Sequence, residues 1–116
     1  MSEEWIEKST TGVPTNYEFG NFDTHYGYLW WVEQGNKRRF PVANIQNKAF
    51  AGTGNRGHYL YIAPSCNLVV AHTVDTPNGA STMAQLSRRF FGTDGITDRE
   101  FTRLLEMIVS AAGLAC

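Results

Sequence analysis

The most constraining feature of this chain is a pair of short apolar segments separated by residues that favour a turn. In His58–Ala63 two tyrosines alternate with a leucine and an isoleucine, and this period of two is typical of a strand whose two faces differ. Pro64–Asn67 has the composition of a tight connection, and the apolar segment Leu68–Val74 follows it. The pattern predicts an antiparallel hairpin in which Leu68–Val74 is apolar enough to be a central strand.

A helix is predicted near the C-terminus. Thr97 and Glu100 have the spacing of a capping box, in which the threonine hydroxyl accepts a hydrogen bond from the Glu100 N–H and the glutamate side chain reaches back. Apolar residues follow at helical spacing, and Gly113 is suited to end the helix. The residues of this apolar face are Phe101, Leu104, Leu105, Ile108 and Ala112. Such a helix can cover one face of a sheet.

The N-terminal part of the chain gives further elements. Ser2 is placed to cap a short helix over Glu3–Ser9, and residues 10–25 have the composition of a loop. Tyr26–Val32 is rich in aromatic and β-branched residues, which favours a strand, and Glu33–Arg39 is predicted to be a polar turn.

The elements combine into an α+β fold. We expect a single domain over residues 1–116, with a three-stranded antiparallel meander that becomes larger if the chain dimerises. The C-terminal helix packs on one face of this sheet, and a short helix lies at the N-terminus. Phe40–Phe50 fits neither a helical nor a strand period, and Thr82–Phe90 could form an additional short helix.

Composition excludes several classes of partner. The formal net charge is -1, which argues against nucleic acid, and the pairs Arg38–Arg39 and Arg88–Arg89 are expected to be solvated. The sequence has no apolar run long enough to span a membrane. Its N-terminus is acidic and unlike a secretory signal, so we expect a cytoplasmic protein. Cys66 and Cys116 are far apart in sequence, which favours free thiols.

A glycine-rich segment matches the letters of a dinucleotide-binding motif. Gly52, Gly54 and Gly57 have that spacing, but a strand pattern follows them where the motif requires a helix, so no cofactor is expected. Glycines can instead let a strand approach a ligand closely and offer it backbone N–H groups. They can also form a bulge that bends the strand, and both interpretations stay open.

Three histidines, one aspartate and one cysteine are the candidates for metal or nucleophile chemistry. His25, His58 and His72 could join Asp75 or Cys66 in a metal site or a catalytic triad. The histidines show no metal-ligand spacing, and Cys66 has no adjacent base in sequence. We therefore expect no metal site and hydrogen-bonded or exposed imidazoles.

The aromatic residues of 26–31 have two interpretations. Tyr26, Tyr28, Trp30 and Trp31 could form a stacking platform, but such platforms for nucleic acid need flanking positive charge. Packing within the sheet is favoured, with one tyrosine left to face a pocket.

Three blocks of the sequence, in this order, resemble the C-terminal segment of serine β-lactamase-related hydrolases. They are the aromatic block Tyr26–Trp31, the glycine segment ending in Gly54–His58, and the hairpin residues Ala63–Val70. The family comprises class C β-lactamases, penicillin-recognising esterases and amide hydrolases, many of them exported. The resemblance implies that the chain corresponds to the last three antiparallel strands and the terminal helix of a larger sandwich. It also implies that the glycine strand forms one wall of the active site and gives an N–H to the oxyanion hole.

The chain differs from this family at the positions of the catalytic residues. The family's nucleophile and base come from a Ser-x-x-Lys motif, and no serine here has a lysine three residues later. Arg56 and His58 stand where glycine and glutamine are common in the family. We therefore expect no hydrolysis by the covalent serine route from this chain alone.

Three functional hypotheses follow. In the first, the chain is a truncated or split relative of a serine hydrolase that forms one wall of a ligand cleft and is inert alone. It would bind itself or a partner through an exposed sheet edge. In the second, it is a small ligand-binding or interaction module, and in the third, another chain supplies the missing catalytic residues. The residues predicted to lie near a ligand are Gly52, Thr53, Gly54, Asn55, Arg56, His58 and Tyr28.

Overall fold

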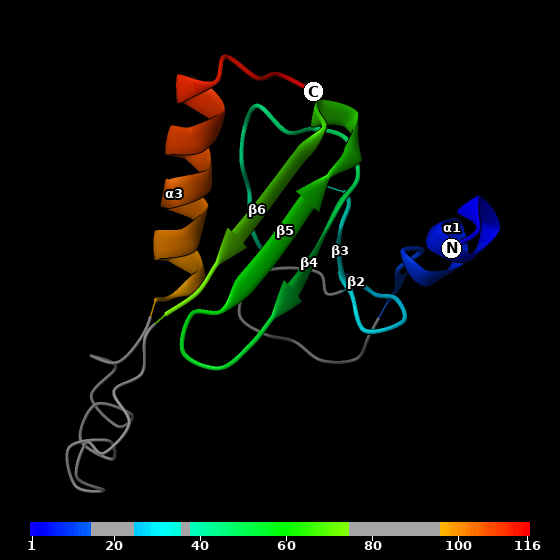
Figure 1. The fold of residues 1–116 in the computed structure, drawn as a ribbon. Helices are drawn as coiled ribbons and strands as arrows, with labels where there is room; N and C mark the ends of the chain where they lie inside the picture. The colour runs from blue at the N-terminus through cyan, green and yellow to red at the C-terminus, as the bar shows by residue number, and fades with distance from the viewer. Residues whose placement is uncertain (15–24, 36–37, 75–95) are drawn as a thin grey trace, which may run out of the picture.

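The computed structural model describes residues 1–14, 25–35, 38–74 and 96–116. It contains a six-stranded antiparallel sheet in which each strand pairs with its neighbours in sequence (Figure 1). The strands are β1 (Val13–Pro14), β2 (His25–Tyr26), β3 (Trp31–Glu33), β4 (Ala49–Thr53), β5 (Tyr59–Ala63) and β6 (Leu68–His72). The helices are α1 (Glu3–Ser9) and α3 (Asp98–Ala111). The predicted α+β fold is confirmed, and the sheet exceeds three strands within one chain.

The predicted hairpin is formed by β5 and β6. Leu60 pairs with Ala71 and Ile62 pairs with Val69, and a short 3-10 helix, η1 (Pro64–Cys66), joins the two strands. The prediction that Leu68–Val74 is a central strand is wrong for the part of the sheet that the structure describes, in which β6 lies at one end of the strand order. Only alternate residues of β6 face the core, so its apolar composition does not reflect burial on both faces.

The aromatic block does not form one strand, which corrects the prediction for Tyr26–Val32. The chain reverses after β2, where the Gly27 N–H donates to the Trp30 carbonyl oxygen (2.8 Å) and Leu29 adopts a φ of 67°. A Cβ atom at Gly27 would collide with the carbonyl oxygen of Ser9 at the end of α1. The reversal therefore packs directly against the end of α1, and glycine permits this close approach.

The capped C-terminal helix is confirmed. The side chains of Thr97 and Glu100 make both hydrogen bonds of the capping box, and Gly113 follows the helix with a φ of 65°. The buried residues of α3 are Phe101, Thr102, Leu105 and Val109. Ala112, which was expected on the buried face, is exposed, and Val109 takes part in the core instead.

The core lies between α3 and one face of β4–β6. The ambiguous segment Phe40–Phe50 crosses this core without regular structure until β4 begins, and it buries Phe40 there. The ring of Phe40 makes edge contacts with Tyr59, Tyr61 and Phe101. Irregular backbone explains why the apolar residues of this segment follow no simple period.

The polar turn predicted for Glu33–Arg39 is wrong at its first residue. Glu33 ends β3 and is buried, and its carboxylate accepts a hydrogen bond from the backbone N–H of Phe40 (3.0 Å). A carboxylate that is buried with a hydrogen-bond partner cannot be recognised from the hydropathy pattern.

The expectation of free thiols is also wrong. Cys66 and Cys116 form a disulfide whose Cα atoms are 5.5 Å apart and whose cysteines are 50 positions apart in sequence. The C-terminal residue is held further by backbone hydrogen bonds, from the Cys116 N–H to the Asn44 carbonyl oxygen (2.8 Å) and from the Gln46 N–H to the Cys116 carbonyl oxygen (2.6 Å). These contacts fasten the end of the chain to the sheet.

Some predictions fall on other parts of the chain. The possible helix over Thr82–Phe90 and the pair Arg88–Arg89 lie outside the described residues, as does most of the loop predicted over residues 10–25. Within the described part of that loop, Val13–Pro14 forms β1 and pairs with β2. No helix in the described ranges is long and apolar enough to cross a membrane.

Candidate functional site

The glycine segment predicted to line a ligand forms the reversal between β4 and β5. Gly52 and Thr53 are the last two residues of β4, and the Gly54 N–H donates to the His58 carbonyl oxygen (2.7 Å) across the turn. Arg56 and Gly57 have φ values of 65° and 104°. The structure therefore brings together six of the seven predicted residues, at the end of β4 and in the turn that leads to β5.

This turn also supports the start of α3. The Ile96 N–H donates to the Arg56 carbonyl oxygen (3.2 Å), and the His72 Nδ1 lies 2.7 Å from the Gly57 carbonyl oxygen. A Cβ atom at Gly57 would lie 2.8 Å from the backbone nitrogen of Ile96. Positive φ and close packing both require glycine at this position, so the sequence signal has a structural cause. Ligand binding by these residues stays a prediction.

Tyr28 lies elsewhere. It belongs to the reversal after β2, it is exposed, and its ring packs at a tilt against Trp5 of α1, with ring centroids 5.4 Å apart. It lines a hollow of about 240 Å³ together with Thr11, Tyr26 and Gly27, none of which belongs to the glycine turn. The other aromatic residues pack within the sheet, since Trp30 contacts Phe50 edge-on and Tyr26 contacts Trp31.

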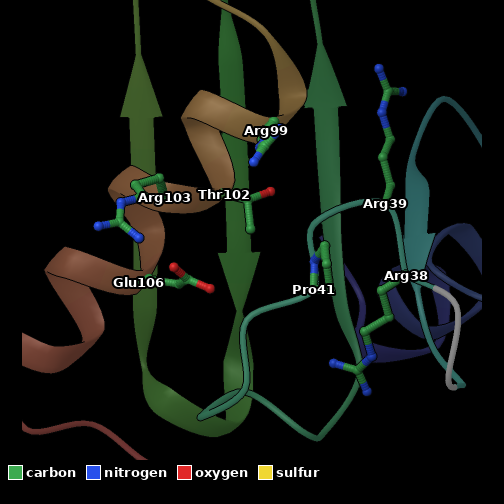
Figure 2. Close-up of a pocket in the computed structure, with 7 residues that line it drawn as sticks. All are labelled: Arg38, Arg39, Pro41, Arg99, Thr102, Arg103 and Glu106. Atoms are coloured by element: carbon green, nitrogen blue, oxygen red, sulfur yellow. The ribbon is translucent and has the colours of Figure 1, made fainter.

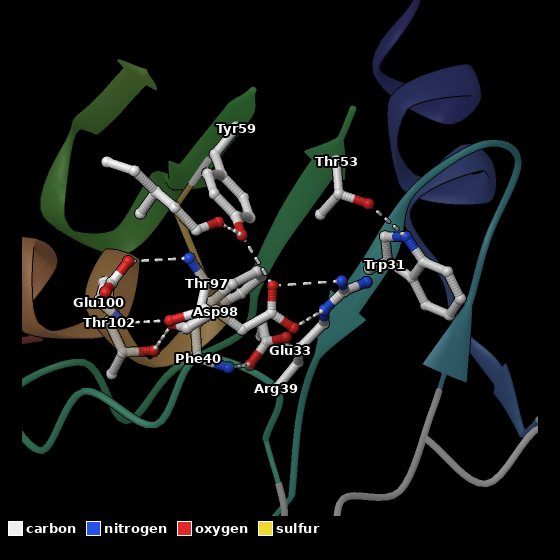
Figure 3. Close-up of polar contacts among 11 residues, drawn as sticks. Trp31, Glu33, Arg39, Phe40, Thr53, Tyr59, Thr97, Asp98, Glu100 and Thr102 are labelled. Atoms are coloured by element: carbon white, nitrogen blue, oxygen red, sulfur yellow. Dashed lines mark hydrogen bonds and ion pairs between the residues drawn. The ribbon is translucent and has the colours of Figure 1, made fainter. Parts of the chain in front are cut away.

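Asp98, at the start of α3, is the centre of a polar network that joins three parts of the chain (Figure 3). Its carboxylate accepts two hydrogen bonds from the Arg39 guanidinium, from Nε (2.8 Å) and from Nη2 (3.3 Å). The Tyr59 hydroxyl of β5 lies 2.9 Å from Asp98 Oδ1 and 2.9 Å from the Ile96 carbonyl oxygen. The Arg39 guanidinium also lies over the Trp31 ring, 5.0 Å from its centroid. This network joins α3 to the sheet and to the segment after β3.

Sequence reasoning missed this network. Arg39 and Asp98 are separated by 59 positions, and no spacing rule relates them. The prediction that Arg38–Arg39 is solvated is wrong, because both side chains are half-buried and hydrogen-bonded. A pair of arginines next to a buried strand was the one available signal.

Three buried ionisable groups lie in or next to the network, and burial raises the pKa of each of them. Burial raises the pKa of Glu33, although the Phe40 N–H and the charges of Arg38 and Arg39 act in the opposite direction. Burial also raises the pKa of the Tyr59 and Tyr61 phenols, and the neighbouring Asp98 and Glu33 charges add to this respectively. Both phenols therefore stay protonated at neutral pH and cannot act as bases.

The chemistry available to the described residues is limited. Cys66 is joined in the disulfide, so it presents no thiolate for nucleophilic attack while the bond is intact. In the ranges that the structure describes, no three His, Cys, Asp or Glu side chains are grouped to hold a metal ion.

The outward face of the β5–β6 hairpin carries apolar residues away from the core. Leu60 and Ile62 are half-buried there, beside Ala71 and Val69, whose side chain is 63% exposed. In the view of Figure 1, α3 and α1 lie on opposite sides of β4–β6. Among the described strands β6 is paired with β5 alone, so its other edge presents backbone N–H and C=O groups.

Comparisons of the chain with protein-family models, with curated proteins and with solved structures found no match.

Proposed function

We propose that this chain is a non-hydrolytic association domain that pairs with a second copy of itself through the edge of β6 and the apolar face beside it. The observation that carries this proposal is the combination of a strand edge that pairs with no other described strand and an exposed apolar residue on the same strand. Natural proteins protect such edges with lysine, proline, bulges or very short strands. The residues of β6, Leu68–His72, include no lysine or proline, and the strand is five residues long.

The symmetry of pairing fits a single kind of chain. Two β6 edges related by a two-fold axis would run antiparallel and satisfy one another's backbone groups, which gives a self-complementary interface. The formal net charge of -1 leaves little overall repulsion between two copies. The joined sheet would also bring the outward residues Val69 and Ala71 of both copies onto one continuous apolar face.

The resemblance to serine β-lactamase-related hydrolases supports the same proposal. In that family this segment is part of a larger sandwich, and here a second copy would extend the sheet. The sequence holds no Ser-x-x-Lys motif, so the domain would act without a serine nucleophile of that kind. A fluorophosphonate probe should therefore fail to label the purified chain, and a mapped adduct on any serine would overturn this part of the proposal.

The disulfide bears on where the domain works. Structural disulfides persist in oxidising compartments and are rare in the cytosol. The Cys66–Cys116 bond therefore favours an oxidising compartment. The cytoplasmic location expected from the N-terminus stays a prediction.

Sedimentation over a range of concentrations tests the pairing. We expect a monomer–dimer equilibrium for the natural sequence. In Val69→Lys, two like charges meet on the joined face and should raise the dimer dissociation constant by about tenfold or more.

Met107→Lys is the matched control, because Met107 is 62% exposed and lies on α3. It adds the same charge at the same exposure, so it should leave the equilibrium unchanged. A chain that stays monomeric at every concentration, or two variants with equal effects, would overturn the proposal.

A further inference from the structure

A groove of about 450 Å³ lies between α3 and the segment that follows β3, and arginines from both sides line it (Figure 2). Its lining residues are Arg38, Arg39, Pro41, Arg99, Thr102, Arg103 and Glu106. The lining therefore contains four guanidinium groups and one carboxylate. The groove is cationic in a chain whose formal net charge is -1, so this charge is concentrated locally.

One wall of the groove is held rigidly. The Arg38 guanidinium donates to the carbonyl oxygens of Ile45 (2.7 Å) and Asn47 (3.1 Å), and also to that of Gln46. Carbonyl oxygens carry no formal charge, so these bonds fix the guanidinium without neutralising it. Arg39 is fixed beside it by the two hydrogen bonds to Asp98.

The other wall carries two arginines that have no such partners. Arg99 and Arg103 are exposed on successive turns of α3, and neither makes a hydrogen bond or an ion pair with another described residue. Like charges four positions apart repel, and Arg99 sits in the first helical turn, where the helix dipole disfavours a cation. Glu100 and Glu106, each three positions from Arg103, offset part of this repulsion, and a bound anion would relieve the remainder.

The geometry points to an anion-binding site. We propose that the groove binds a compact phosphate dianion, either as inorganic phosphate or as the monoester of a small alcohol. Arg99 and Arg103 would donate to the phosphate oxygens, because the planar guanidinium fork matches phosphate geometry. Arg38 would supply positive potential from the opposite wall, because its partners are uncharged carbonyl oxygens, whereas Asp98 already neutralises most of the charge of Arg39.

Size and charge narrow the ligand. A volume of about 450 Å³ lies within the range of small-molecule sites, whereas a polyanion such as nucleic acid would need a longer basic stripe. The Glu106 carboxylate lies one turn beyond Arg103 and would repel a second anionic group. A phosphate monoester with an uncharged, hydroxyl-bearing remainder therefore fits the groove better than a diphosphate or a dicarboxylate.

Calorimetric titration tests the site, with inorganic phosphate and glycerol 1-phosphate as probes at constant ionic strength set by chloride. We expect saturable binding of both probes and tighter binding of the monoester. The double variant Arg99→Gln, Arg103→Gln should weaken binding by about a hundredfold, since each bond to a charged group contributes about a factor of ten or more. Arg103→Lys, which keeps the charge and loses the fork, should give a smaller loss.

The matched control is Lys8→Gln, Lys48→Gln, which removes the same charge at exposed positions that do not line the groove. It should bind both probes as the natural sequence does. Helical circular dichroism and the thermal midpoint establish that each variant folds, which is expected because Arg99 and Arg103 are exposed. Binding that is no stronger than for chloride, or an equal loss in the lysine control, would overturn the proposal.

Discussion

The two faces of strands β4–β6 are both apolar but differ in burial, although they are formed by alternate residues of the same strands. The inward face buries Ala51, Tyr59 and Tyr61 against α3 and the segment after β3. The outward face carries Leu60, Ile62 and Val69, of which Val69 is mostly exposed. Apolar composition alone does not tell these faces apart. What distinguishes them is the cover that distant parts of the chain provide.

The largest effect should come from truncating the covered face. Phe101 is fully buried and stacks on Tyr59, with ring centroids 4.2 Å apart. Phe101→Ala should lower the free energy of unfolding by about 3–5 kcal/mol, because it loses buried apolar area and leaves a cavity. Urea denaturation measures this change.

The matched truncation on the outward face is Val69→Ala. Its side chain is mostly exposed, so the change should stay within about 0.5 kcal/mol in the monomer. Comparable losses in the two variants would mean that the outward face is covered in solution, and the contrast between the faces would fail.

The next largest loss of stability should come from removing the disulfide, which holds the chain closed over the inward face. It joins the end of η1 to the C-terminus across 50 positions, and α3 lies within the closed loop. Cys66→Ser combined with Cys116→Ser should lower stability by about 2–4 kcal/mol, mainly by releasing the unfolded chain. A reducing agent should destabilise the natural sequence equally and leave the double variant unchanged. Equal stability of the two proteins without reductant would contradict a structural role for the bond.

The elements that could be predicted from the sequence are those whose signals are local. The alternation of β5, the capping box of Thr97 and Glu100, and the cap of α1 by Ser2 each depend on residues a few positions apart, and all three are confirmed. The failures depend on distant contacts. Tyr26–Val32 was predicted as one strand because its aromatic composition suits a strand, but the fit of Gly27 against Ser9 decides where the chain reverses.

The candidate sites also divide into features with a local sequence signal and features that depend on distant contacts. The glycines at 52–57 were correctly singled out as special backbone, yet Gly57 is required by its packing on Ile96, which lies 39 positions later. The arginine groove is formed by residues that approach one another only when α3 packs on the sheet. Arg38–Arg39 carries no motif and was expected to be solvated, and the sequence gives no signal that relates this pair to Arg99 and Arg103.

The smallest effect concerns Glu33, at the boundary between the sheet and the arginine wall. Its folded-state pKa is raised by burial, so the folded protein binds a proton more tightly there than the unfolded chain does. The contribution of this group to stability is therefore fully present below the unfolded pKa of about 4.5 and is lost as the pH rises through the folded value. Glu33→Gln removes this titration while the amide oxygen can still accept the hydrogen bond from Phe40.

The difference between the two proteins isolates Glu33 from the other carboxylates. We expect the variant to gain stability relative to the natural sequence as the pH rises from below 4.5 to neutrality, in urea unfolding series at each pH. The opposite trend would mean that the charges of Arg38 and Arg39 outweigh burial and hold the carboxylate ionised. In that case Glu33 would neutralise part of the cationic wall, and the variant should also bind phosphate more tightly than the natural sequence does.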